Sequence, residues 1–276
     1  MTTEHRRVRL LASVTCEAEA HLAAIHGADI VDCKNPAEGA LGALAPATVT
    51  AIRAALPASV PVSATIGDLA PEPGPVLEAA RAMAATGADI VKVGFFPGGD
   101  ALATIRHLGD RLAASTPLVA VLMADGAHTL DLALVSALGE AGFAGVMLDT
   151  AVKDGRTLLD HRGRDELAAF LEAAAGAGLM AGLAGSLRLA QIPVLLALEP
   201  DVLGFRGALC RASDRVQGLD ADALAAVRRA IPRTSPPLCG EGLGVGGTST
   251  ADGLGSSPPD LPHKGGGAPL RLEPTP

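Results

Sequence analysis

The feature that most constrains this chain is a five-residue sequence that returns at regular intervals. Gly27-Ala28-Asp29-Ile30-Val31 recurs 60 residues later as Gly87-Ala88-Asp89-Ile90-Val91, and looser versions start at Gly142 and Glu199. Each copy opens a short apolar run, and an alanine-rich segment with helical periodicity follows it. Self-similarity at a fixed period predicts a fold in which one supersecondary unit is used several times.

Apolar runs and helical patterns alternate along most of the chain. The predicted strands are Val8–Val14, Asp29–Cys33, Val60–Ile66, Asp89–Val93, Leu118–Met123, Gly145–Asp149, Met180–Ala184 and Val202–Arg206. The predicted helices lie near Glu17–His26, Pro46–Leu56, Pro75–Thr86, Asp100–Ala114, Thr129–Ala141, Arg164–Ala177, Leu189–Leu198 and Ala221–Ile231. Strands this apolar, each followed by a helix, indicate parallel strands covered on the outside. Eight such units in about 230 residues predict an α/β fold, a single-domain (β/α)8 TIM barrel, for which about 250 residues is typical.

An open doubly wound sheet is the alternative, because it also alternates strands and helices. No Gly-x-Gly-x-x-Gly follows the first predicted strand, so we favour the barrel. From Thr234 the chain changes character: eight prolines and ten glycines occur in the last 43 residues without apolar periodicity, which is typical of disorder. The expected organisation is therefore a catalytic barrel domain over residues 1–233 and a disordered tail over 234–276.

Charge and composition exclude several classes of function. A net charge of −8 and the scarcity of basic clusters argue against a nucleic-acid partner, and no run approaches the roughly 20 apolar residues of a membrane span. No secretory signal follows the basic residues at the start, and the four scattered cysteines lack metal-site spacing. We therefore expect a cytoplasmic protein with reduced thiols, no metal ion, and no contact with membrane or nucleic acid. The sequence leaves a homo-oligomer open.

Lysine is rare in this chain, and its positions are informative. The chain holds 18 arginines and four lysines; Lys34, Lys92 and Lys153 follow apolar strand-like runs at intervals of 58 and 61 residues, and Lys264 lies in the tail. A surface cation can be either residue, whereas a desolvated lysine can lose its proton and attack a carbonyl. We therefore predict that the first three lysines serve one shared site.

These lysines and two aspartates are expected to meet at the mouth of the barrel, where the loops after the strands carry the chemistry. Side chains alternate along a strand, so Asp32 and Lys34 share the inward face, and Lys92 also points inward. Asp149 ends the sixth predicted strand, and Lys153 follows it in a turn. Converging ammonium groups lower the pKa of at least one lysine, which gives an amine able to form a Schiff base; the aspartates orient the lysines or carry protons. Salt bridges that only close the barrel mouth are the alternative.

Two glycine-containing loops are candidates for binding a substrate phosphate. Gly185-Ser186 follows the seventh predicted strand, and Arg206-Gly207-Ala208 closes the eighth. Barrels of this kind often bind phosphate there, through backbone N–H groups that small residues leave open. Plain glycine turns are the alternative. Arg211, Asp214 and Arg215 either add charge to this region or form solvated surface.

Three further polar residues, His128, His161 and Asp68, also fall in loops after predicted strands. A histidine in a loop is more often solvated than catalytic. Asp68 directly follows the third predicted strand and its Gly67, so it is either a site residue or a loop cap.

Taken together, these segments resemble the (5-formylfuran-3-yl)methyl phosphate synthase family, also called 4-(hydroxymethyl)-2-furancarboxaldehyde-phosphate synthase. The matching stretches are Asp32-Cys33-Lys34-Asn35-Pro36, Gly39-Ala40-Leu41-Gly42-Ala43, Val62-Ser63-Ala64-Thr65-Ile66-Gly67-Asp68, Lys92-Val93-Gly94, Leu148-Asp149-Thr150-Ala151-Val152-Lys153-Asp154-Gly155, Leu183-Ala184-Gly185-Ser186-Leu187 and Arg206-Gly207-Ala208-Leu209-Cys210. The resemblance runs from about Leu10 to Ile231 and leaves the tail unmatched. The loops at Pro71-Glu72-Pro73-Gly74 and Phe95-Phe96-Pro97-Gly98 lack tyrosines that relatives carry, which concerns substrate contacts and not the lysine chemistry.

The resemblance implies a class I aldolase-like lyase that condenses two molecules of glyceraldehyde 3-phosphate into (5-formylfuran-3-yl)methyl phosphate, with loss of phosphate and water. It implies that Lys34 forms the Schiff base and Lys92 acts as acid and base, with Asp32, Asp149 and Lys153 at the remaining active-site positions. The product would supply the furan ring of methanofuran-type one-carbon carriers, so the resemblance implies a methanogen or a methylotroph. A protonated imine is itself an electron sink, and we expect no cofactor.

Two other functions stay open on the residues alone. The nearer one is another lysine-dependent phosphosugar aldolase or isomerase on the same barrel. The other is a non-catalytic barrel that binds a phosphate metabolite and uses its lysines only to hold anions. Borohydride separates the second from an enzyme, because only an imine is reduced to a permanent adduct.

Overall fold

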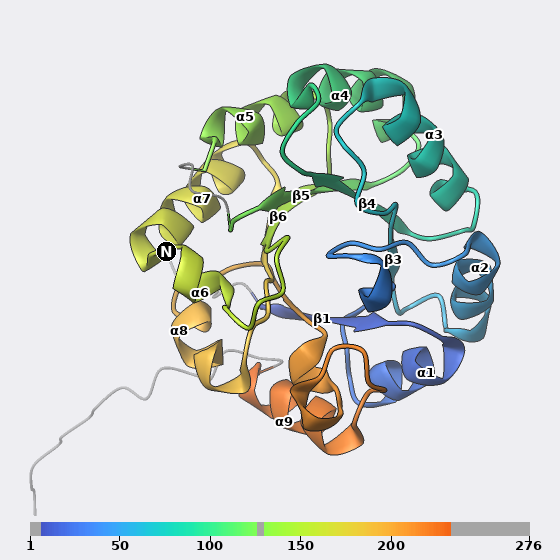
Figure 1. Ribbon diagram of the computed structural model, residues 1–276, viewed down its shortest axis with the longest axis vertical. Coiled ribbons are helices and arrows are strands. Elements are labelled where there is room, and N and C mark those ends of the chain that lie inside the picture. Colours follow the sequence, from blue (N-terminus) through green and yellow to red (C-terminus); the bar gives the residue numbers. More distant parts are fainter. Residues whose placement is uncertain (1–6, 126–129, 233–276) are drawn as a thin grey trace, which may run out of the picture. The chain divides into compact units, whose positions relative to one another are not determined.

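The computed structural model describes residues 7–125 and 130–232, and these residues form a closed barrel of eight parallel strands (Figure 1). The strands follow one another in sequence order, and β8 pairs with β1 to close the ring. The predicted (β/α)8 TIM barrel is therefore confirmed, and the open sheet is excluded. The chain divides into a unit of Met1–Pro236 and a unit of Pro237–Pro276. The predicted tail, 234–276, and His128 lie outside the described residues.

The strands lie close to their predicted positions. They are β1 (Arg9–Val14), β2 (Ile30–Cys33), β3 (Val62–Thr65), β4 (Ile90–Phe95), β5 (Leu118–Met123), β6 (Gly145–Asp149), β7 (Met180–Leu183) and β8 (Val202–Phe205). Strand β4 continues two residues beyond its predicted end, to Phe95, because it pairs with β5 as far as Leu122. Lys92 therefore lies in the middle of its strand and deeper in the barrel than Lys34, which directly follows β2.

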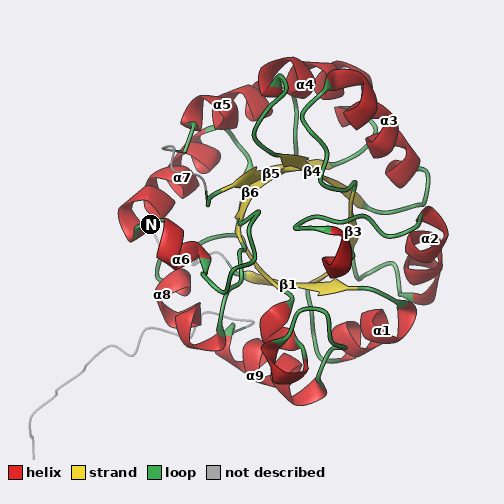
Figure 2. Ribbon diagram, in the orientation of Figure 1, coloured by secondary structure: helices red, strands yellow, loops and turns green. Residues whose placement is uncertain are grey.

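Helices surround the strands on the outside of the ring (Figure 2). They are α1 (Glu17–Ile25), α2 (Pro46–Ala55), α3 (Pro73–Ala84), α4 (Ala101–Leu108), α5 (Leu132–Glu140), α6 (Leu158–His161), α7 (Arg164–Gly176), α8 (Ile192–Leu196) and α9 (Ala221–Ala230).

The helix predictions were too simple in two places. The predicted helix over 100–114 divides into α4, capped by Asp100, and a π-helical turn over Gly109–Ala113. The predicted helix over 189–198 divides into a 3₁₀ turn and α8. Pro193 lies in the first turn of α8, where its missing N–H costs no hydrogen bond, so the α-helix begins there.

Alternation along the strands creates two apolar layers. Outward side chains such as Val31 and Val91 join the large core between the strands and the helices. Inward side chains such as Leu11, Met147 and Val202 form a smaller cluster inside the ring. Glycine makes room for Met147, because a Cβ at Gly182 would lie 2.6 Å from its Cγ. This inner apolar cluster fills the middle of the ring, and polar side chains lie at the C-terminal ends of the strands.

The repeated Gly-Ala-Asp sequence pairs each even-numbered strand with the strand before it. The N–H of Asp29 donates to the carbonyl of Leu10 over 2.8 Å, and the Asp29 carboxylate accepts from the N–H of Leu10 over 2.9 Å. Asp89 makes the same reciprocal contact with Val62, and Asp201 makes it with Ala181. The looser copy that starts at Gly142 has Ala144 in place of the aspartate. It keeps only the backbone hydrogen bond, from the N–H of Ala144 to the carbonyl of Leu118. The repeat therefore fixes strand starts at the N-terminal end of the barrel.

Candidate active site

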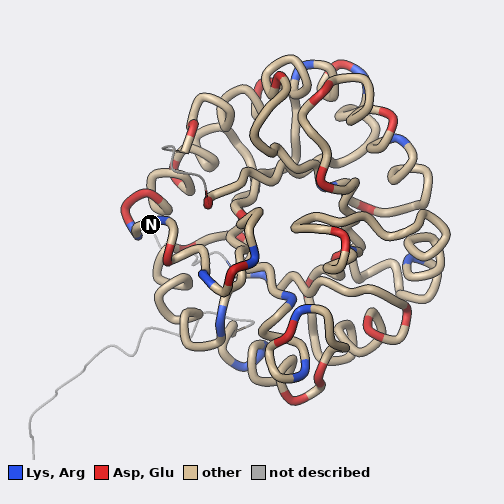
Figure 3. The backbone as a smooth tube through the Cα atoms, in the orientation of Figure 1, with Lys and Arg blue, Asp and Glu red and all other residues tan. Residues whose placement is uncertain are grey.

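A cavity of about 800 Å³ opens at the C-terminal ends of the strands. Lys34, Lys92, Asp149 and Lys153 line its inner part, and the loops after β7 and β8 line its outer part. The structure thus brings all three lysines that precede the tail to one site, as the sequence predicts. In Figure 3 the lysines and arginines near the mouth of the ring gather on the side where α8 and α9 lie.

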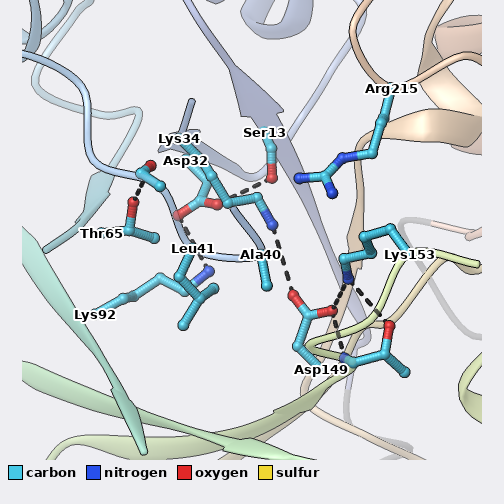
Figure 4. A network of polar contacts seen from close by, with 12 residues as sticks. Ser13, Asp32, Lys34, Ala40, Leu41, Thr65, Lys92, Asp149, Lys153 and Arg215 are labelled. Atoms are coloured by element: carbon cyan, nitrogen blue, oxygen red, sulfur yellow. Dashed lines mark hydrogen bonds and ion pairs between the residues drawn. The ribbon is translucent and has the colours of Figure 1, made fainter. Parts of the chain in front are cut away.

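Asp149 connects two of the lysines (Figure 4). Its Oδ2 lies 3.5 Å from Nζ of Lys34, and its Oδ1 accepts a hydrogen bond of 2.8 Å from Nζ of Lys153. Lys153 also donates to the hydroxyl of Thr150 over 3.0 Å, and the N–H of Thr150 donates to Asp149. Lys34 is 7% exposed, so its amine reaches the cavity without being surrounded by water.

Asp32 holds the third lysine. Its Oδ1 lies 3.1 Å from Nζ of Lys92, and the hydroxyls of Ser13 and Ser63 donate to its two oxygens over 2.9 and 2.6 Å. Asp32 is fully buried and Lys92 is 4% exposed. The sequence pairs Asp32 with Lys34, its neighbour on the same strand face. The structure instead gives Asp32 its direct contact with Lys92, and Lys34 extends toward Asp149 on the opposite wall.

Burial lowers the pKa of Lys34, because the interior disfavours the charged ammonium. The charge of Asp149 opposes this shift, and repulsion by Lys92 adds to it. The pKa of Lys34 is therefore lowered, as predicted, although desolvation contributes more to this shift than repulsion between the lysines does. A lowered pKa increases the fraction of Lys34 that carries a free, nucleophilic amine.

The two carboxylates stay ionised. Burial raises the pKa of Asp149, but the charges of Lys153 and Lys34 outweigh burial and leave this pKa below its ordinary value. Burial likewise raises the pKa of Asp32, and Lys92, Lys34 and the hydrogen bond from Ser63 outweigh it. Each aspartate therefore provides a fixed negative charge at the site, while the lowered pKa of Lys34 favours its neutral form.

The loops after β7 and β8 present free backbone donors to the cavity. The N–H groups of Gly185, Ser186, Gly207 and Ala208 donate no hydrogen bond to any described residue. Gly185 has a φ of 110° and Ser186 a φ of 51°, a left-handed conformation that is unusual for serine. Gly207 and Ala208 begin a 3₁₀ turn whose first N–H groups have no partner inside the turn. Four donors of this kind suit a phosphate group.

Arg206, expected beside these donors as a phosphate ligand, is instead bound inside the protein. Its five N–H donors are all occupied: two by Glu19, and one each by the carbonyls of Ser13, Arg215 and Gln217. The pair with Glu19, at 2.6 Å, is buried. Arg206 therefore clamps the loop after β8, and this geometry does not support direct contact with a phosphate. Glu19 lies 187 residues earlier on α1, a separation that sequence reasoning could not bridge.

Two other aspartates act as loop caps. Asp68 accepts from the N–H groups of Ala40 and Leu41 over 2.8 and 2.6 Å, so the loop-cap alternative for this residue is the one that the structure supports. Asp125 makes the corresponding pair of bonds with Ala151 and Val152. Asp68 thus fixes the loop that follows Lys34, and Asp125 fixes the loop that carries Lys153.

Three site residues carried no strong sequence signal. Ser13 and Ser63 are inward positions on their strands, and only their shared partner Asp32 gives them a role. Arg215 lines the cavity and donates to the carbonyl of Gly39 over 2.8 Å. His161, by contrast, ends the short helix α6 and is absent from the cavity lining.

Residues 7–125 and 130–232 contain neither a cluster of metal ligands nor a membrane-spanning helix. No group of three or more histidines, cysteines, aspartates or glutamates there is arranged to hold a metal ion. The helices in these ranges are all too short or too polar to cross a bilayer.

The closed barrel, with lysines and carboxylates at its mouth, defines a protein of the (β/α)8 barrel class. Among solved structures it resembles 3-hexulose-6-phosphate synthase, with a TM-score of 0.57 and 21% identity over 82% of this chain and 100% of that one. It also resembles 3-keto-L-gulonate-6-phosphate decarboxylase of Vibrio cholerae, with a TM-score of 0.58 and 16% identity over 83% and 100%. At these identities the likeness shows the shared fold alone.

The chain belongs to the 4-HFC-P synthase family, whose model matches residues 10–228. The (5-formylfuran-3-yl)methyl phosphate synthase of Methanococcus maripaludis is 39% identical over 76% of this chain and 92% of its own length. That of Methanocaldococcus jannaschii is 37% identical over 76% and 93%. A protein of Methylorubrum extorquens, whose name assigns the same activity provisionally, is 45% identical over 78% and 87%. The predicted family is therefore confirmed.

Proposed function

We propose that this protein is a Schiff-base-forming lyase that condenses two molecules of glyceraldehyde 3-phosphate into (5-formylfuran-3-yl)methyl phosphate. The observation that carries the proposal is the amine of Lys34, which is buried, has a lowered pKa and faces a cavity with four free N–H donors. A carbonyl held by its phosphate on those donors can reach this amine. Family membership supports the product, because the named relatives make this furan phosphate.

The proposed chemistry begins with attack of the Lys34 amine on the substrate carbonyl. The carbinolamine loses water to give a protonated imine, which withdraws electrons and makes the neighbouring C–H acidic. Removal of that proton gives an enamine whose carbon attacks the carbonyl of the second molecule. Over the whole reaction two triose phosphates give one furan phosphate, one inorganic phosphate and two molecules of water, so no oxidant or reductant is needed.

Each remaining residue has a role that follows from its contacts. Lys92, paired with Asp32 beside the reacting amine, exchanges protons with the bound carbon chain. Asp149 lies within reach of Lys34 and Lys153 and can pass a proton between them as the imine forms. The N–H groups of Gly185, Ser186, Gly207 and Ala208 hold a phosphate. Arg206 positions the loop after β8 and does not touch substrate.

The test is to incubate the purified protein with glyceraldehyde 3-phosphate and to follow furan absorbance together with free phosphate. Borohydride added during turnover should leave an adduct on the peptide that contains Lys34, identified by mass spectrometry. A sugar phosphate product without furan absorbance would indicate another phosphosugar aldolase. Phosphate binding without any adduct would indicate a non-catalytic barrel. Activity that EDTA abolishes and a divalent metal restores would contradict the proposed absence of a metal cofactor.

A further inference from the structure

We propose that Arg215 forms a second anion position in the cavity, separate from the backbone donors, and that it holds the phosphate of the second substrate molecule. This inference rests on the proposed function, in which both condensing molecules carry a phosphate. The four N–H groups after β7 and β8 can serve only one of them. The second phosphate needs its own partner during the carbon–carbon step.

The side chain of Arg215 is only partly used by the protein. One Nη2 hydrogen bond, of 2.8 Å to the carbonyl of Gly39, is its sole side-chain bond to any described residue. Its Nε and Nη1 are left without a partner in the same set. Figure 4 shows the guanidinium pointing into the space bordered by Ser13, Lys34 and Lys153. A half-buried guanidinium with unused donors beside a reactive amine is a strong partner for phosphate.

The protein fixes both ends of this side chain. At the backbone, Arg206 donates to the carbonyl of Arg215 over 2.9 Å, and Glu19 holds Arg206 in place. Arg215 also follows two residues with left-handed backbone, Ala212 at a φ of 51° and Ser213 at a φ of 58°. Strained conformations of this kind persist only where the surrounding contacts enforce them.

The acceptor at the tip of the side chain is equally constrained. Gly39 has a φ of 120°, and a Cβ there would lie 2.1 Å from Oδ2 of Asp68. Only glycine fits at this position, so the carbonyl that anchors Arg215 has a fixed place. Arg215 therefore extends from the loop after β8 to the loop after β2.

The first experiment counts anion sites in the full-length protein with inorganic phosphate alone, by calorimetry and phosphorus NMR. The wild type should bind two phosphate ions, and Arg215→Gln should bind one. Arg211→Gln is the matched control, because Arg211 is an exposed residue of the same loop that does not line the cavity, and it should bind two. A wild type that binds one ion, or an Arg215→Gln protein that still binds two, would overturn the proposal.

The second experiment separates the two substrate molecules. In Arg215→Gln, the borohydride adduct on Lys34 should form at the same substrate concentration as in the wild type, within about twofold. Furan formation should fall about 10- to 100-fold, because a charge-assisted hydrogen bond to the second molecule is lost. Arg215→Lys should recover part of this loss, and circular dichroism checks that both variants are folded. A parallel fall in adduct formation would place Arg215 on the first molecule and contradict the proposal. If the wild type binds two phosphate ions but forms no adduct, the proposed Schiff-base function is wrong, and so is the role of Arg215 in binding the second substrate molecule. The proposed anion position at Arg215 would still be supported.

Discussion

The two ends of the barrel both place aspartates against cations, and the comparison shows what distinguishes a structural pair from a reactive one. At the N-terminal end, Asp29 meets Arg228 at 2.6 Å and Asp89 meets Arg53 at 2.5 Å, and both carboxylates also accept backbone N–H groups. At the C-terminal end, Asp32 and Asp149 meet lysines. Arginine stays charged in either place, whereas a buried lysine can become neutral. The same type of contact therefore joins structural elements at one end and, in the proposed function, prepares chemistry at the other.

The sharpest test of this contrast is Lys34→Arg. It replaces a lysine–aspartate pair at the C-terminal end by an arginine–aspartate pair of the kind found at the N-terminal end. Arginine keeps the charge opposite Asp149 but cannot form an imine, so turnover and the borohydride adduct should both disappear. Furan absorbance and mass spectrometry of the trapped peptide measure the two losses. An adduct on Lys92 or Lys153 in the wild type would show that the nucleophile has been assigned to the wrong residue.

Lys92→Arg should be the next most damaging change. It keeps a cation beside Asp32 but removes an amine that exchanges protons, so turnover should fall by about 10²- to 10⁴-fold, the usual contribution of general acid–base catalysis. The adduct on Lys34 should still form, because the carbonyl can be captured without Lys92. Equal loss of adduct and turnover would mean that Lys92 is needed for imine formation as well.

At the structural end, Asp29→Asn should affect stability and not activity. The substitution removes the charge opposite Arg228 and weakens the bond to the N–H of Leu10, at a cost of about 1–3 kcal/mol in the free energy of unfolding. Urea unfolding followed by circular dichroism gives that value, and kcat of the folded protein should be unchanged. A change in kcat without a change in stability would break the division of roles between the two ends.

The pH dependence of imine trapping reports the pKa of Lys34. Since burial lowers this pKa, trapping should rise with pH through a midpoint below the ordinary lysine value of about 10.4. Lys92→Met removes a repelling charge, so it should move the midpoint to higher pH. Asp32→Asn removes an attracting charge and should move it to lower pH. Shifts with the opposite signs would show that the lysines are not electrostatically coupled in this way.

The smallest effect is expected from removal of residues 234–276. Their proline- and glycine-rich composition has too little apolar content to dock firmly on the barrel. A chain ending at Arg233 should keep the turnover and thermal midpoint of the full-length protein. A marked fall in either quantity would show that residues 234–276 contribute to activity or stability.

Most of the fold was predictable because its signals are local and repeated. Apolar runs gave the eight strands, and the alternation of side chains correctly placed Asp32, Lys34 and Lys92 inside the ring. The pairing of those side chains was not predictable, because residues two apart on a strand point the same way while their charged tips reach different walls. Asp32 thus meets Lys92 from β4, and Lys34 meets Asp149 from β6.

The role of Arg206 shows a second limit of sequence reasoning. An arginine at the end of the last strand, beside glycine, looks like a phosphate ligand. Its actual partner, Glu19, lies on α1 at the other end of the chain, and the closed ring brings the two together. Long-range closure of this kind leaves no trace in local spacing. The repeated Asp29 and Asp89, by contrast, could be recognised as equivalent before their hydrogen bonds were known.

The gathering of every described lysine at one cavity has a consequence for chemical labelling. Amine-directed reagents usually scatter over a protein because lysines cover its surface, whereas here Lys34, Lys92 and Lys153 are the amine side chains of the described barrel. Lys153 is the most accessible of the three, with 18% of its side chain exposed. A small aldehyde or activated ester should therefore modify the described barrel almost only inside its cavity, with Lys264 and the α-amino group of the chain as the competing targets elsewhere.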